Sequence, residues 1–216
     1  MPEERVSWKD SNLALIGSDL DHKIKQAAAE GEPQWQGMGE EACLKVWRIE
    51  QFKVVPSPPP YGSFHTGDSY VVLHSYQADP NTPKLNHDLH IWIGKESSQD
   101  EYGTAAYKMV EADDYLGGAA VQHREVQANE SEMFKEYFDG PLMYMAGGVA
   151  SGFRHVEETK EIPMLYRVKG TNKKMSLTEM ELAKSSLNAG DSFILVIGKT
   201  SVFLWNGEGV SLGPFA

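Results

Sequence analysis

Acidic side chains are the residues of this chain whose types and spacing could do chemistry. Asp68 follows a glycine at the start of a predicted strand, and Glu101 lies in the first turn of a predicted helix. Carboxylates and backbone carbonyls are the hard oxygen ligands that Ca²⁺ prefers, and the glycine-rich GGVAS turn exposes carbonyls well. The sequence has no EF-hand loop, so a calcium site must be assembled from distant segments. A helix-capping role for Glu101 and a turn-forming role for Asp68 remain the alternatives.

A second candidate site lies near the other end of the same predicted helix. Asp113 is followed by a GGAA turn, in which the carbonyls of Gly118 and Ala120 are available as ligands. An acid–base pair of Asp113 and Asp114 is disfavoured, because adjacent residues on a helix point about 100° apart. The histidines lack a zinc-ligand spacing, and the glycine-rich turn lacks the Lys-Ser/Thr of a phosphate loop. We therefore expect no enzyme, and we interpret Cys43 as a structural thiol.

The charge of the chain excludes one class of partner. The 216 residues carry a net charge of −11, and residues 1–162 account for −13 of it (14 basic against 27 acidic) whereas residues 163–216 carry +2 (6 against 4). A nucleic-acid-binding surface needs a basic patch, so we expect no nucleic-acid partner. No apolar stretch approaches the roughly 20 residues of a transmembrane helix, and the N-terminus has no signal-peptide pattern. A single cysteine is typical of a reducing compartment, which indicates the cytoplasm.

The elements that must position these acids form an α+β pattern. Residues 1–40 resemble an arm with one short helix, and residues 44–55, 68–77 and 88–95 read as strands. A long helix is predicted from Ser98 to about Leu116, with a capping-box spacing at its start and Gly117-Gly118 at its end. The strand VQHREVQ, the short helix SEMFKEYF and the strand LMYMAGG follow. We expect these elements to make one sheet with two helices.

An internal repeat divides the chain. LKVWRIEQFK is echoed by MLYRVKGTNK, GDSYVVL by GDSFILV, and the strand ending WIG by the strand ending WNG, in the same order and 113 to 123 residues later. The sequence therefore predicts an arm at 1–40, a complete domain at 41–158 and a partial second copy at 159–216. The second copy has no counterpart of the long helix. It must be incomplete, pack on the first domain or be completed by a partner.

Several of these segments together resemble the gelsolin superfamily, most of all its severin and fragmin group. The matching segments, in family order, are LKVWRIEQFKVVPSPPPYGSFHTGDSYVVL, LHIWIGKESSQDEYGTAAYKMVEADDYLGG, VQHREVQANES and GGVASGF. The resemblance implies a gelsolin-like domain, whose central mixed sheet is sandwiched between one long and one short helix, followed by a truncated second copy. It also implies a cytoplasmic, cytoskeletal protein that binds actin in a calcium-dependent manner, caps barbed ends, binds monomers and, less directly, severs filaments.

The resemblance also implies which residues form the sites. The intradomain calcium site corresponds to the carbonyls of Gly67 and Val149 with the carboxylates of Asp68 and Glu101. The calcium site shared with actin corresponds to Asp113 and the carbonyls of Gly118 and Ala120. Asp113 supplies only one negative charge, so an acidic residue of actin would complete that site. The outward face of the long helix would contact actin through Thr104, Tyr107, Lys108 and Glu111, with Tyr107 as an aromatic anchor and Lys108 as a cation.

Two departures from the family pattern limit these implications. The basic phosphoinositide-binding run expected before GGVAS is FDGPLMYMA, which has no basic residue, so we do not expect lipid binding there. Lys169, Lys173 and Lys174 offer a thinner alternative. In the second copy, Gly190-Asp191 matches half of a calcium site, and we predict no complete third site. The other functional class left open is an interaction or scaffold domain that keeps the structural calcium site but not actin binding.

Overall fold

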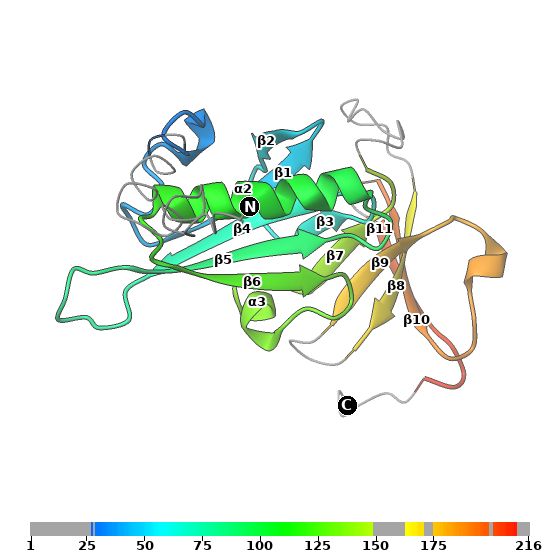
Figure 1. Cartoon of the computed structure of the whole chain (residues 1–216). Coiled ribbons are helices and arrows are strands. Elements are labelled where there is room, and N and C mark those ends of the chain that lie inside the picture. The colour runs from blue at the N-terminus through cyan, green and yellow to red at the C-terminus, as the bar shows by residue number, and fades with distance from the viewer. Residues whose placement is uncertain (1–26, 28, 149–162, 171–174, 199–200, 211–216) are drawn as a thin grey trace, which may run out of the picture.

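Two β-sheets and one long α-helix make up the described part of the protein in the computed structural model (Figure 1). The structure describes residues 27, 29–148, 163–170, 175–198 and 201–210. None of the helices in these ranges is long and apolar enough to cross a membrane. The two sheets lie side by side, and the long helix runs across the first of them. This arrangement confirms the predicted α+β class.

The first sheet has five strands in the order β2-β1-β4-β5-β6. Their bounds are Cys43–Glu50 (β1), Lys53–Pro56 (β2), Ser69–Tyr76 (β4), Asn86–Ile93 (β5) and Ala120–Val126 (β6). The four neighbours β2, β1, β4 and β5 are antiparallel, whereas β5 and β6 are parallel. A parallel pair needs a crossover connection, and here it is the long helix. The predicted single strand 44–55 is in fact a hairpin, because Gln51 and Phe52 adopt positive φ angles of 49° and 65°.

The long helix α2 (Gln99–Tyr115) covers one face of this sheet. Its start is the predicted capping box, in which Ser98 accepts a hydrogen bond from the Glu101 amide and Glu101 accepts one from the Ser98 amide. Its end is the predicted glycine pair, since Gly117 and Gly118 have φ near +70°. A stripe of small and flexible side chains packs the helix on the sheet. The stripe is Ala105, Met109 and Ala112, and it contacts the core formed with Leu73, Leu89 and Ile91.

The opposite face of the first sheet is covered by the short helix α3 (Glu132–Glu136) and aromatic side chains. Phe64 stacks on Trp92 with ring centroids 4.7 Å apart, and Phe134 of α3 lies 5.9 Å from Phe64. The sheet therefore lies between one long and one short helix, as the sequence predicts.

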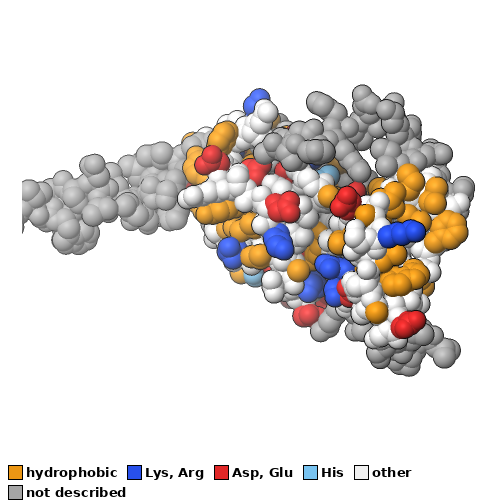
Figure 2. Space-filling model, turned by 90° about the vertical axis from the view of Figure 1, so that its right-hand side faces the viewer, with side chains coloured by type: hydrophobic (Ala, Val, Ile, Leu, Met, Phe, Trp, Pro, Cys, Tyr) orange, Lys and Arg blue, Asp and Glu red, His pale blue; other side chains and the backbone are white. Residues whose placement is uncertain are grey.

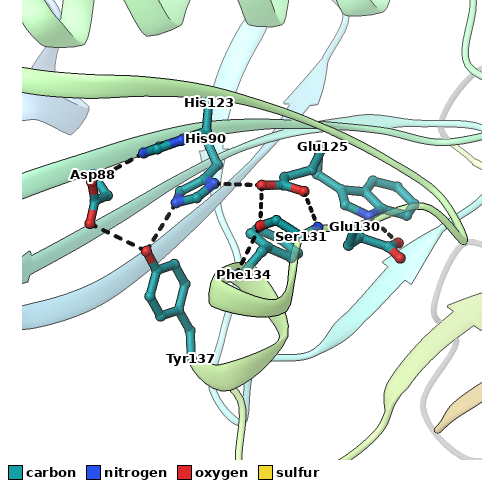
Figure 3. A network of polar contacts seen from close by, with 9 residues as sticks. Asp88, His90, His123, Glu125, Glu130, Ser131, Phe134 and Tyr137 are labelled. Atoms are coloured by element: carbon teal, nitrogen blue, oxygen red, sulfur yellow. Dashed lines mark hydrogen bonds and ion pairs between the residues drawn. The ribbon is translucent and has the colours of Figure 1, made fainter. Parts of the chain in front are cut away.

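A buried polar network fixes α3 to the sheet (Figure 3). His90 Nδ1 lies 3.1 Å from Glu125 Oε1, and His90 Nε2 lies 3.1 Å from the Tyr137 hydroxyl. His123 Nε2 lies 3.1 Å from Asp88 Oδ1, and the two imidazole rings are stacked. Burial alone raises the Glu125 pKa, but hydrogen bonds from His90 and the α3 cap outweigh it and leave this pKa below its ordinary value. The network joins β5, β6 and the end of α3.

The second sheet has six strands in the order β11-β10-β8-β9-β7-β3. Their bounds are Ser63–His65 (β3), Leu142–Met145 (β7), Met164–Lys169 (β8), Ser176–Met180 (β9), Ser192–Ile197 (β10) and Ser201–Asn206 (β11). The expectation that LMYMAGG completes the first sheet was wrong, because β7 pairs with β3 and β9 in this second sheet. The second copy thus packs on the first through a shared sheet.

The two sheets repeat the same strand topology. The order β2-β1-β4-β5 of the first copy corresponds to β9-β8-β10-β11 of the second. The segment assigned to the arm also contributes to the first copy, because the turn η3 (Pro33–Trp35) places Trp35 in the core, edge-on to Trp47 at 5.1 Å. The core of the first copy therefore begins before residue 41.

Candidate functional site

Asp68 lies at the start of β4 and is completely buried. Arg48 Nε of the neighbouring strand β1 donates to Asp68 Oδ2 at 2.6 Å, and the Arg48 Nη2 group forms an ion pair with the same oxygen. A buried carboxylate without a cation is strongly destabilising, and the guanidinium supplies that positive charge. In the second copy a cation of the neighbouring strand also pairs with the corresponding acid, but from another position: Lys169 of β8, two residues beyond the counterpart of Arg48, forms an ion pair with Asp191, which lowers the Asp191 pKa.

Gly147 and Gly148, the two described residues of the glycine-rich turn, lie directly against Gly67 and Asp68. The Gly67 amide donates to the Gly147 carbonyl at 2.8 Å. A Cβ atom on Gly148 would lie 2.6 Å from Asp68 Oδ1, and one on Gly67 would lie 2.9 Å from the Gly147 oxygen. Only glycine permits this close approach of two backbone segments. Val149, the fourth predicted ligand, lies outside the described residues.

Glu101 is connected to the same region through two serines. Glu101 Oε2 accepts hydrogen bonds from the Ser98 amide at 3.0 Å and from the Ser97 hydroxyl at 3.4 Å. The Ser97 hydroxyl in turn lies 2.9 Å from the Ser69 hydroxyl, and Ser69 follows Asp68 in the chain. The sequence analysis did not identify Ser97 and Ser69 as part of this site. Their signal was position, because Ser69 follows Asp68 directly and Ser97 lies four residues before Glu101. Glu101 therefore caps the helix, and hydrogen bonds through Ser97 connect it to Ser69, the residue next to Asp68.

The donor atoms of this first site suit a hard cation. Among the residues that the structure describes, no three His, Cys, Asp or Glu side chains are grouped as a metal site. A metal ion would therefore need backbone carbonyls as well as carboxylates, which is the ligand mixture that Ca²⁺ accepts and that zinc does not. A cation bound at Asp68 would share this carboxylate with Arg48.

The three residues of the second candidate site are brought together at the end of α2. Asp113 Oδ1 accepts a hydrogen bond from the Ala120 amide at 3.0 Å, and the Gly118 amide donates to the Asp113 carbonyl at 2.8 Å. Asp113 Oδ2 accepts a hydrogen bond from Nε2 of the Gln122 side chain at 2.8 Å. A Cβ atom on Gly117 or Gly118 would meet no atom within 4 Å, so a partner has room to approach.

Between the two candidate sites, α2 presents aromatic side chains to solvent. Tyr107 is 66% exposed, and Tyr102 and Phe52 are exposed beside it. With Gly103 and Thr104 these residues line a shallow hollow of about 550 Å³. Sequence reasoning missed Phe52, because a continuous strand over 44–55 would not present this residue at a turn. An exposed aromatic cluster of this kind is typical of an interaction surface.

Two of the other predicted contact residues of α2, Lys108 and Glu111, are held by contacts within the protein. Lys108 Nζ lies 2.8 Å from Glu32 and 3.0 Å from Glu111, and Trp35 Nε1 donates to Glu111 at 2.9 Å. Only 14% of the Lys108 side chain is exposed. Burial alone lowers the Lys108 pKa, but the two carboxylates outweigh it and raise it. The predicted outward orientation therefore holds for Tyr107, whereas Lys108 and Glu111 hold η3 against α2.

Comparison with known proteins decides the family. The gelsolin repeat model matches residues 51–135, which run from the β1–β2 turn to α3. Gelsolin-like protein 1 of Lumbricus terrestris is 48% identical over 206 residues, which cover 95% of this chain and 56% of the relative. The chain belongs to the gelsolin superfamily. Severin of Echinococcus granulosus is 43% identical over 207 residues, which cover 93% of this chain and 55% of severin.

This gelsolin-superfamily chain spans about half the length of these curated relatives. A solved structure, the Thorarchaeota 2DGel3/rabbit actin complex, aligns with a TM-score of 0.40 and 24% identity, covering 78% of this chain and 79% of that chain. The sequence identities to these relatives and the matching repeat model confirm the predicted resemblance at the level of the superfamily. The fold follows the same pattern, with one gelsolin-like unit and a partial second copy.

Proposed function

We propose that this gelsolin-superfamily chain is a calcium-dependent actin-binding protein that binds monomers, caps barbed ends and severs filaments. The exposed aromatic hollow on α2, between two groups of calcium-compatible oxygens, is the observation that carries this proposal. Tyr107, Tyr102 and Phe52 supply apolar contact area, and contacts of this kind commonly dominate binding energy. We also propose that the chain is organised as predicted, with an arm (1–40), a first gelsolin-like domain (41–158) and a partial second domain (159–216).

Calcium would act at both ends of the helix. Asp68 and Glu101, with the carbonyls of Gly67 and Val149, would hold one ion inside the first domain. Ca²⁺ supplies two positive charges that neutralise carboxylates and crosslink the segments bearing them. Because Glu101 caps α2 and Asp68 begins β4, their ligation would tie the helix to the sheet.

The second ion would lie between this chain and actin. Asp113 and the carbonyls of Gly118 and Ala120 provide an incomplete ligand set with one negative charge, which an acidic group of the partner would complete. A shared cation also reduces repulsion between two acidic proteins, and this chain carries a net charge of −11. We also propose that the protein acts in the cytoplasm, on the actin cytoskeleton. We propose no catalytic activity for it and no phosphoinositide site in the FDGPLMYMA segment.

Substitution of Asp113 tests the proposal. Asp113→Asn keeps an oxygen that can accept the Ala120 hydrogen bond, and the exposed Gln122 side chain can turn its own amide oxygen toward the new NH2 group, so the fold and melting temperature should be unchanged. Loss of the negative charge should weaken binding of monomeric actin in calcium by about tenfold, equivalent to 1.4 kcal/mol. Fluorescence titration of labelled actin in calcium and in chelator measures this change. The matched control is Asp139→Asn, an exposed aspartate beyond α3.

An unchanged calcium-dependent affinity in Asp113→Asn, with the control also unchanged, would contradict the shared-ion model. Absence of actin binding by the unmodified protein in calcium would instead support the alternative, an interaction domain that has lost actin.

A further inference from the structure

The glycine-rich turn of the first candidate site is held in part by the second copy. β7 of the first copy and β9 of the second are parallel neighbours in the shared sheet, and their pairing ends with Tyr144 opposite Thr178. Glu179 follows Thr178 in β9, and its Oε2 atom accepts a hydrogen bond from the Ala146 amide at 3.0 Å. A side chain of the second copy therefore contacts the backbone of the first copy just beyond β7.

This contact lies one residue from the part of the turn that packs on the predicted ligands. Ala146 precedes Gly147, whose carbonyl accepts a hydrogen bond from the Gly67 amide at 2.8 Å. Gly148 comes next, and a Cβ atom on it would lie 2.6 Å from Asp68 Oδ1. A binding site works only when its groups are held within about 0.5 Å of the productive geometry. The position of the turn therefore determines how well Gly67 and Asp68 are placed for an ion.

The Glu179 side chain continues the contact between the copies where the strand ladder stops. Ala146 lies beyond the last paired residue of β7, so its amide has no ladder partner in β9 and uses the carboxylate instead. Main-chain amides need an acceptor, and a hydrogen bond to an ionised carboxylate is about twice as strong as one between neutral groups. The second copy thus holds the turn through this side chain.

We propose that Glu179 is a positioning residue for the intradomain calcium site, so that docking of the second copy and binding of calcium at Asp68 strengthen each other. The inference rests on the proposed calcium site and adds to it a residue that is not among the proposed ligands. With the turn held in place, less of the free energy of ion binding goes into ordering the ligands. Coupling between two sites is reciprocal, so calcium should stabilise the contact between the copies to the same extent.

The charge of Glu179, acting at a distance, is the other way in which this residue could influence an ion. Figure 2, which views the molecule from the side of the second sheet, shows acidic and basic side chains intermingled there. Salt screens such surface charges over about 8 Å at physiological ionic strength. Two variants separate the mechanisms: Glu179→Gln keeps an oxygen that can accept from the Ala146 amide but loses the charge, whereas Glu179→Ala loses both.

Calorimetric titration of the whole chain with calcium, in the absence of actin, tests the proposal. The reference protein and all variants carry Asp113→Asn, so that the other proposed site lacks its carboxylate. Glu179→Ala should weaken calcium binding about tenfold, equivalent to 1.4 kcal/mol, and Glu179→Gln by no more than about threefold. The matched control is Glu181→Ala, because Glu181 is an exposed acid two residues further along the second copy, and it should bind calcium like the reference protein.

The reciprocal effect supplies a second readout. Calcium should slow hydrogen–deuterium exchange of the β9 amides in the reference protein and should have a smaller effect in Glu179→Ala. The rise in melting temperature on addition of calcium should also be smaller in Glu179→Ala, because a ligand stabilises the folded state in proportion to its affinity. A merely structural role would instead lower the melting temperature equally with and without calcium.

The outcomes separate this inference from the proposed function. Unchanged calcium affinity in Glu179→Ala would overturn the positioning role while the calcium site itself stands. Equal losses in Glu179→Gln and Glu179→Ala would also overturn it, since they would point to charge, and so would an equal loss in Glu181→Ala. A reference protein that binds no calcium would overturn the intradomain site and this inference together. Because the titration contains no actin, its result does not depend on the proposed actin binding.

Discussion

Gly103 is the position where stability and binding should respond in opposite directions. It lies in the interior of α2 with an ordinary helical φ, and a Cβ atom placed on it would meet no atom within 4 Å. Glycine in a helix interior is less favourable than alanine by about 1 kcal/mol, because its backbone loses more freedom on folding. Gly103→Ala should therefore raise the free energy of unfolding by about 1 kcal/mol. For a chain of this size, that is a rise in melting temperature of about 2–4 °C.

The effect on actin binding should be a loss. Gly103 lines the hollow with Tyr107 and Phe52, so a partner packed into the hollow would meet the added atoms. Overpacking of a well-packed contact costs about 1–3 kcal/mol, which is about a 5- to 150-fold weaker affinity. Gly103→Ala should lie at the lower end of this range and Gly103→Gln at the upper end.

Thermal unfolding and fluorescence titration of monomeric actin in calcium separate the two effects. Gly140→Ala is the matched control, because Gly140 also has open space around its Cβ position but lies outside α2. The control should leave actin affinity unchanged. Unchanged affinity in both Gly103 variants would refute the assignment of the hollow as the actin contact. A lower melting temperature in Gly103→Ala would refute the helix argument itself.

Two further predictions concern stability. Lys108→Met should lower the free energy of unfolding by about 1–3 kcal/mol in urea denaturation, because it removes the charged hydrogen bonds to Glu32 and Glu111; a value equal to that of the unmodified protein would contradict the η3–α2 contact. Burial lowers the pKa of His65, His74 and His87 below that of the unfolded chain. The unfolded state then binds more protons as the pH falls from about 7 to about 5, so stability should decrease over that window. Urea denaturation midpoints that stay constant as the pH is lowered from about 7 to about 5 would contradict this expectation. So would a His74→Gln variant whose stability depends on pH as strongly as that of the unmodified protein.

Local sequence patterns predicted much of the fold, whereas the pairing of strands that are distant in the sequence could not be predicted from them. The capping box at Ser98 and the glycine pair after Leu116 defined α2 because both signals act within one turn of the helix. The internal repeat likewise indicated a second copy with the same strand order. In contrast, an apolar strand such as β7 does not encode its neighbours, and its place in the second sheet depends on β9, which lies far along the chain.

The candidate site shows the same contrast between residues that are close in the sequence and residues that only the fold brings together. Asp113, Gly118 and Ala120 lie within one helix end and its turn, so their proximity followed from the sequence. The orientation of Lys108 did not, because Glu32 and Trp35 approach α2 from a segment about 76 residues away in the chain and compete for the helix face. Arg48 at Asp68 was missed for a similar reason, since cross-strand register determines which cation reaches a buried acid.

Gel filtration of this chain with monomeric actin, first in calcium and then in chelator, tests the central claim most directly. Calcium-dependent actin binding predicts co-elution in calcium and separate elution in chelator. Separate elution in calcium would contradict actin binding, and co-elution that chelator does not change would contradict the role of calcium.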